Sequence, residues 1–135
     1  FEINIRAFPL TIVVPWELAV DLDFSKADME YVLTDSTPEG ELITKMLDSS
    51  LESFGRLYLS DGFAAAIVIE PEMITDFKYY HTETGLCGIT RGVCLLDKRG
   101  YPDTPTPNVF WVTSIKKQIA LDIMRDSLRR EQASE

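Results

Sequence analysis

The segment STPEGELITKMLDSSLESFG, residues 36–55, carries the clearest local signal in this sequence. Ser36 and Glu39 have the spacing of a capping box, and Gly55 is placed to end a helix. The apolar residues between them recur at helical spacing: Leu42, Ile43, Met46, Leu47, Leu51 and Phe54. We therefore predict an amphipathic helix over residues 38–54.

Upstream of this helix, residues 1–14 mix β-branched and aromatic side chains with few breakers. This composition predicts one long strand or two short strands around Pro9. Residues 16–24 are ambiguous from sequence alone. Ser25 is a suitable cap for a short helix over residues 26–33.

Downstream of residue 55 the pattern changes from helical to extended. Residues 56–60 and 63–69 flank the dipeptide Asp61-Gly62, which suits the tight turn of a β-hairpin. We therefore predict two paired strands in this part of the chain.

Two more extended segments follow, over residues 75–81 and 86–96. A turn at residues 82–85 separates them, and Lys98-Arg99-Gly100 is a further turn signal. Because the connections are short, antiparallel meander pairing is favoured over crossover units.

The last third begins with the proline-rich segment PDTPTP, residues 102–107, which predicts an exposed loop. Thr113 or Ser114 is a candidate cap for a final helix over residues 114–130. Its apolar residues form one stripe: Ile115, Ile119, Ala120, Ile123, Met124 and Leu128.

Together these segments predict an α+β fold, with an antiparallel meander sheet of about five strands packed by two main helices, 38–54 and 114–130. The length of 135 residues fits a single domain, residues 1–135. Because the first residue is Phe1 rather than Met, we expect a processed form or fragment of a longer chain. Helix-grip and profilin-like folds share this order of elements, so the order does not choose a function.

Composition indicates a soluble globular protein, with 45% hydrophobic and 26% charged residues. No apolar run is long enough for membrane insertion. The net charge is −9, and residues 1–55 contribute −8 of it. General nucleic-acid binding is therefore disfavoured, although an acidic surface that occupies a DNA-binding protein stays open. The compartment is unknown from sequence.

Cys87 and Cys94 are the only two cysteines. Two cysteines make neither a disulfide framework nor a zinc site, and on one regular strand their odd separation would point them to opposite faces. Gly88 and Gly92 could introduce a bulge between them. We expect buried free thiols.

His81 is the only histidine and therefore the natural candidate for proton transfer near neutral pH. On a strand it would share a face with Tyr79 and Glu83, so Glu83 could orient the imidazole. The alternative is that His81 only ends an amphipathic strand. Tyr79, Tyr80 and His81 are the candidate mouth of a pocket between the sheet and the final helix.

Asp21-Leu22-Asp23 superficially resembles the Asp-x-Asp of haloacid-dehalogenase-class phosphotransferases and of metal-dependent glycosyltransferases. Phe24 and Ser25 depart from the first class, and the sequence lacks its alternation of parallel strands and helices. The glycines at 85, 88 and 92 match no phosphate-binding motif. We expect no metal site and no cofactor.

Partner binding is the other candidate activity. The final helix carries Lys116, Lys117, Arg125 and Arg129, and the aromatic residues Phe110 and Trp111 precede it. Since no catalytic motif is present, the sequence predicts a non-enzymatic protein-interaction module or a subunit of a larger assembly, bound to another protein or to itself. The alternative is a domain that binds a small molecule, with or without catalysis, in the pocket named above.

Overall fold

The computed structural model describes residues 1–33, 37–99 and 105–129. Its helices are α1 Glu2–Ala7, α2 Trp16–Leu22, α3 Lys26–Val32, α4 Pro38–Phe54, α5 Ser60–Ile69 and α6 Lys117–Arg129, with short 3-10 helices η1 Pro71–Met73 and η2 Gly88–Thr90. Its strands are β1 Thr11–Val13, β2 Ile74–Thr84, β3 Cys94–Asp97 and β4 Val109–Ile115.

Some of the predicted features fall outside the described residues. These are the cap at Ser36, the glycine of the turn at Gly100, residues 102–104 of the proline-rich loop and the helix end at Arg130. The structure describes the remaining features.

The strands of the described residues form one sheet in the order β1-β4-β2-β3. β1 pairs with β4 in parallel, with Thr11 opposite Val109, whereas β2 is antiparallel to both β3 and β4. The α+β class is thus confirmed. The prediction of about five strands in an all-antiparallel meander is wrong, because the described sheet has four strands and includes a parallel pair.

The predicted hairpin around Asp61-Gly62 is wrong. Helix α5 spans Ser60–Ile69 and contains both residues. Phe63, Ala66 and Ile67 are buried on it. A helix whose surface is largely apolar has a continuous run of apolar residues in its sequence. Such a run is also typical of a buried strand, so the two cannot be distinguished by periodicity alone. Consecutive alanines favour the helix.

The predicted strand over residues 1–14 is correct only at its end. Glu2–Ala7 forms helix α1, with Glu2 and Arg6 paired one turn apart, and the strand β1 is limited to Thr11–Val13. The ambiguous stretch that follows is helix α2, Trp16–Leu22.

The predictions for the next two helices are confirmed. Ser25 caps α3 by a reciprocal capping box with Asp28, whose backbone N–H donates to Ser25 Oγ at 3.2 Å. α4 begins at Pro38 and ends before Gly55, which adopts a left-handed conformation with φ of 69°. The cap of α4 is Thr37, whose hydroxyl accepts from the Gly40 N–H at 3.0 Å.

The final helix is confirmed but begins later than residue 114. β4 continues through Ile115, and the backbone N–H of Lys116 donates to the Met73 carbonyl at 2.8 Å. Because this bond holds the chain beside η1, α6 begins at Lys117.

The strand predicted over residues 75–81 is confirmed, but β2 continues to Thr84, through most of the turn predicted at 82–85. The extended segment predicted at 86–96 is only partly a strand, since β3 is limited to Cys94–Asp97. Both cysteines are free, but the expected burial is wrong for Cys87, which is exposed beside the 3-10 helix η2, and Cys94 is only half-buried.

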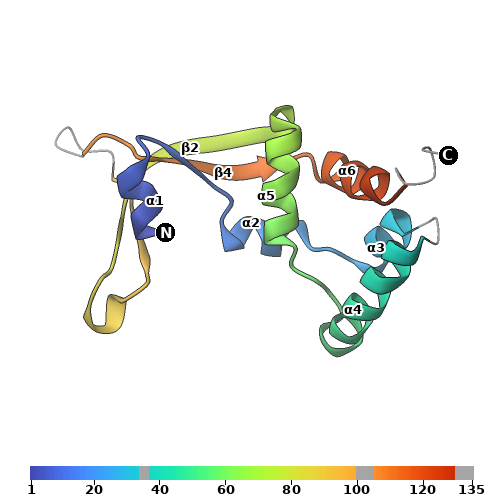
Figure 1. Ribbon diagram of the computed structural model, residues 1–135. Helices are drawn as coiled ribbons and strands as arrows, with labels where there is room; N and C mark the ends of the chain where they lie inside the picture. Colours follow the sequence, from blue (N-terminus) through green and yellow to red (C-terminus); the bar gives the residue numbers. More distant parts are fainter. Residues whose placement is uncertain (34–36, 100–104, 130–135) are drawn as a thin grey trace.

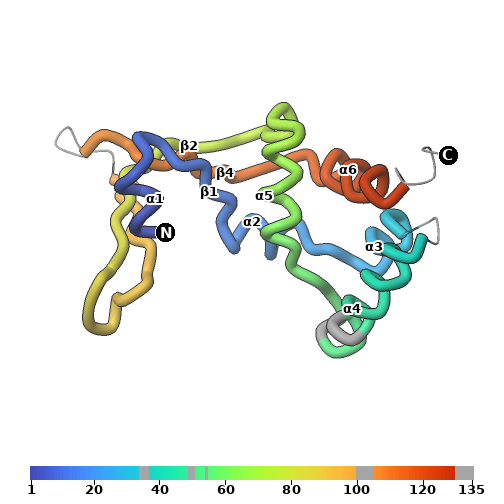
Figure 2. Tube along the Cα trace, viewed as in Figure 1, coloured from blue at the N-terminus to red at the C-terminus, as the bar shows by residue number. Residues whose placement is uncertain are grey.

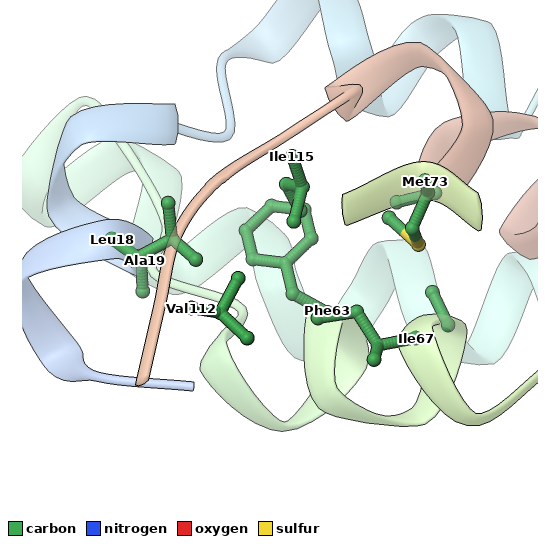
Figure 3. Packing of buried hydrophobic residues seen from close by; sticks show 9 residues of the cluster. Leu18, Ala19, Phe63, Ile67, Met73, Val112 and Ile115 are labelled. Atoms are coloured by element: carbon green, nitrogen blue, oxygen red, sulfur yellow. The ribbon is translucent and has the colours of Figure 1, made fainter. Parts of the chain in front are cut away.

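The main core lies where α2, α5 and the start of α6 meet β4 (Figure 3). Figure 3 shows the ring of Phe63 between Ile115 and Val112, with Met73 beside it. A second cluster joins α3 to α6: Phe24, Met29, Val32, Leu57 and Leu121. The core therefore occupies one end of the sheet, and the β2–β3 hairpin projects from the other end (Figure 2). Among the described residues, no helix has both the length and the apolar character to cross a membrane.

Candidate functional site

His81 lies on β2 directly opposite Asp97 of β3. Its Nδ1 is 3.0 Å from the carbonyl oxygen of Thr106, and its Nε2 is 3.6 Å from Glu83 Oε1. Since a carbonyl oxygen only accepts, Nδ1–H is the donor in the contact with Thr106. The ring is therefore held in one orientation with Nε2 facing the carboxylate.

Two cavities meet at His81. One, of about 530 Å³, is lined by both charge signs, including Glu83, Asp97 and Arg99. The other, of about 320 Å³, lies between β2 and α1 and also contains Asn108. The first falls within the usual size range of small-molecule sites. Both are open to solvent, and their polar groups can donate and accept hydrogen bonds.

Asn108 holds the backbone next to His81 in place through two side-chain hydrogen bonds. Its Oδ1 accepts from the Thr82 N–H at 2.9 Å, and its Nδ2 donates to the Thr82 carbonyl at 3.0 Å. The Thr82 hydroxyl donates to the Leu95 carbonyl at 3.1 Å. Asn108 directly precedes β4, so its side chain, through Thr82, links the start of β4 to β2 and β3 beside the imidazole.

The three residues predicted at the mouth of a pocket, Tyr79, Tyr80 and His81, lie in different environments. Tyr79 is exposed and joins an aromatic cluster, with ring centroids 5.6 Å from Phe77 and 5.5 Å from Phe110. Tyr80 is half-buried and pairs with Val109. Of the three, only His81 lines the cavities described above. These cavities are formed with β3, the residues around Pro105 and α1, whereas the contact between the sheet and α6 is filled by the main core.

The six residues predicted to bind a partner also lie in different environments and do not form one surface. Phe110 and Trp111 are half-buried on β4, and Lys116 is exposed. Arg129 is exposed at the end of α6. The other two basic residues of the set form the contact between α6 and α3.

In that contact, Lys117 Nζ lies 2.7 Å from Asp28 Oδ2 and also donates to the carbonyl of Asp23. Burial is the largest influence on the pKa of Asp28 and raises it, but hydrogen bonds from Lys117 and Ser25 outweigh burial, so the pKa is below its ordinary value. Asp23 has a φ of 41°, unusual for a residue other than glycine, and one of its buried carboxylate oxygens has no hydrogen-bond partner.

Arg125 stacks its guanidinium on Tyr31, with Cζ 4.7 Å from the ring centroid. The Tyr31 hydroxyl donates to Asp122, and this bond raises the pKa of Tyr31 and lowers that of Asp122. Lys117 and Arg125 thus have intramolecular partners that the sequence did not indicate. Within the described part of the chain, no group of three or more metal-binding side chains is placed to hold a metal ion.

Sequence reasoning missed an apolar groove of about 370 Å³ between α3, α4, α5 and α6. Its lining is almost entirely apolar and includes Met29, Leu33, Ile43, Leu47, Ile69 and Met124. The helical periodicity of α4 marked Ile43 and Leu47 as buried, but both are only half-buried in this structure. The apolar periodicity of α4 therefore identifies residues of the groove, but from sequence alone it predicts a fully buried helix face.

No family model matches this chain, and the search of curated proteins found no match. Solved structures do match. An inosine-guanosine nucleoside hydrolase is similar over 87% of this chain and 38% of its own, with a TM-score of 0.77 and 20% identity. A plant nucleoside hydrolase is similar over 94% of this chain and 43% of its own, with a TM-score of 0.74 and 14% identity. The chain thus has the fold of a part of these proteins, and spans less than half of their length.

Proposed function

We propose that this chain is one part of a nucleoside hydrolase-type protein and acts on a nucleoside together with the rest of that fold. The observation that carries the proposal is the similarity to two nucleoside hydrolases over 87% and 94% of this chain. A match over nearly the whole chain to less than half of each hydrolase supports a module that a further polypeptide segment completes. This proposal retains the interaction role predicted from sequence.

The exposed apolar residues support the need for completion. Several large ones lie close together in the chain, from α1 to the start of α2: Ile3, Phe8, Leu10, Ile12 and Trp16. β1 is an edge strand of only three residues, and the buried hydroxyl of Thr11 on it has no partner. An unpaired edge with apolar neighbours is a site where another strand can add. We name this surface, Ile3 to Trp16, the β1 edge surface.

The His81 site supports the nucleoside part of the proposal. A nucleoside presents sugar hydroxyls and base heteroatoms, which pair with carboxylate, amide and imidazole groups. Glu83, Asp97 and Asn108 supply such groups around His81, in cavities open enough for a ligand to enter.

Binding can be tested by NMR on the ¹⁵N-labelled chain titrated with inosine or guanosine. We expect saturable shifts of amide signals near His81, with a Kd of about 1–10 mM, because this chain supplies only part of the contacts. His81→Gln should weaken binding several-fold. Lys78→Gln, on the exposed face of the same strand, is the matched control and should have no effect.

Two results would overturn the proposal. One is the absence of any saturable shift with either nucleoside at about 10 mM. The other is equal binding of free ribose and of the nucleoside, which would show that the base is not recognised. Saturable shifts confined to residues far from His81 would keep the nucleoside role but remove His81 from it.

A further inference from the structure

The apolar groove between α3, α4, α5 and α6 lies where α4 stands away from the sheet (Figure 1). None of the described apolar side chains on α4 is fully buried: Leu42 and Met46 are exposed, and Ile43, Leu47 and Leu51 are half-buried. The groove has a volume of about 370 Å³. An apolar cavity of about 150 Å³ is enough to hold benzene, so this groove has room for an aromatic ring with an aliphatic chain.

The walls of the groove can adjust to an apolar ligand. Two methionines, Met29 on α3 and Met124 on α6, line it, and methionine side chains are flexible and polarisable. Gly62 of α5 lies beside Met124, where an added Cβ would be 2.9 Å from Met124 Cε. A glycine inside a helix destabilises it relative to alanine, and here the missing side chain leaves room for Met124.

A second, charged cavity of about 760 Å³ adjoins the groove between α3 and α4 and shares two lining residues with it. We name it the outer cavity. Its lining includes one basic and three acidic residues: Lys26, Glu30, Asp48 and Glu52. Lys26 and Glu30 are four residues apart on α3, the spacing of an ion pair within a helix. Asp48 and Glu52 have the same spacing on α4, where two like charges repel, so a positive charge beside them relieves this repulsion.

We propose that the groove and the outer cavity together bind a hydrophobic organic cation, that is, a small apolar body that carries an ammonium group. The apolar body occupies the groove, whose lining is almost entirely apolar, and the ammonium lies in the outer cavity near Asp48 and Glu52. Charge complementarity decides this class of ligand, because an anion of the same shape would place its charge beside two carboxylates. Exposed ion pairs contribute little free energy, so the apolar body supplies most of the affinity and the carboxylates supply the selectivity.

This site is separate from the proposed nucleoside site. Within the described part of the chain, neither the groove nor the outer cavity shares a lining residue with the two cavities at His81. The inference therefore goes beyond the proposed function and does not depend on it.

The first test compares three ligands that share one apolar body: phenylbutylammonium, phenylbutanol and phenylbutyrate. Each is titrated into the ¹⁵N-labelled chain, and the amide signals of α3, α4, α5 and α6 are followed by NMR. We expect saturable shifts with a Kd of about 0.1–1 mM for the ammonium ligand. The alcohol should bind about 3- to 10-fold more weakly, and the carboxylate more weakly still.

The second test places the apolar body in the groove. Ala65→Phe adds a ring to the wall that α5 contributes, so all three ligands should bind at least about 10-fold more weakly. Val68→Phe is the matched control, since Val68 is also exposed on α5 but does not line the groove, and it should have no effect. Circular dichroism verifies that each variant is folded.

The third test places the ammonium group. The double variant Asp48→Asn with Glu52→Gln should make the ammonium ligand bind as weakly as the alcohol, while the Kd of the alcohol stays unchanged. The matched control is Glu39→Gln with Glu41→Gln, which removes the same charge from exposed positions at the start of α4. This control should keep the preference for the ammonium ligand.

Three outcomes would overturn the proposal: no saturable shift with any of the three ligands up to about 10 mM, equal binding of the ammonium and the carboxylate, or equal effects of Ala65→Phe and Val68→Phe. Loss of the ammonium preference in the Glu39 and Glu41 double variant would also do so, since the preference would then reflect the net charge of −9. Inosine shifts near His81 in a chain that does not bind phenylbutylammonium would leave the proposed function intact while excluding this site. Binding of phenylbutylammonium without any nucleoside shift would do the reverse.

Discussion

Asn108→Ala is a sharp test of how the sheet is held together beside His81. The substitution removes both hydrogen bonds from the Asn108 side chain to the backbone of Thr82, at 2.9 and 3.0 Å. Thr82 is only 1% exposed, so water has little access to the freed backbone groups. A typical hydrogen bond contributes about 0.5–1.5 kcal/mol, and stranded buried groups add to the cost, so we expect a loss of about 2–3 kcal/mol. The melting temperature should fall by about 8–12 °C.

The assay is urea unfolding followed by far-ultraviolet circular dichroism, with the slope m unchanged so that the midpoint alone reports stability. Asn4→Ala, an exposed position on α1, is the matched control and should change stability by less than about 0.5 kcal/mol. A loss below about 0.5 kcal/mol in Asn108→Ala would refute the reasoning. It would mean that water, or a shift of β2, satisfies Thr82 in the variant.

Other positions give further tests. Phe63→Ala, at a fully buried core position, should cost about 3–5 kcal/mol in the same urea assay, whereas exposed Phe8→Ala should cost less than about 1; equal losses would contradict the assigned core. Burial raises the pKa of Asp28, but hydrogen bonds, led by the one from Lys117, outweigh burial, so the pKa in the folded state lies below the ordinary value of 3.8. The contribution of Asp28 to the free energy of unfolding is therefore complete above pH 3.8 and is lost as the pH falls through the lower folded-state pKa. Asp28→Asn should therefore lose less stability than the wild type on acidification, and parallel acid titrations of stability would refute this. A Cβ on Gly85 would lie 2.0 Å from the Thr90 carbonyl oxygen, so Gly85→Ala should raise amide hydrogen exchange across the tip of the β2–β3 hairpin, residues 85–93, by at least about 10-fold without changing exchange in α5. Unchanged exchange in residues 85–93 would show that the tip accommodates a Cβ.

The helices α3 and α4 were predicted from local signals, which are caps and apolar periodicity. α4 has apolar residues at helical period and Gly55 at its end, and α3 has Ser25 as a side-chain cap. Capping and periodicity are local properties, since they involve residues within one or two turns. They can therefore be read without knowledge of the rest of the fold.

The errors occur where local sequence is ambiguous and long-range packing decides. Asp61-Gly62 is a good turn dipeptide, yet α5 includes it, because burial of Phe63 and Ala66 against other elements favours a helix there. β1 has only three residues, and its parallel partner begins at Val109. No sequence pattern within β1 or β4 indicates that they pair, so the mixed sheet could not be predicted from the sequence.

The candidate site shows the same division. His81 and Glu83 were predicted to share a strand face, and they lie 3.6 Å apart between Nε2 and Oε1. Their cavities, however, depend on β3 and on Asn108, which approach only in the folded chain. Lys117 and Arg125 were candidates for partner binding because their partners on α3, Asp28 and Tyr31, lie far away in the sequence.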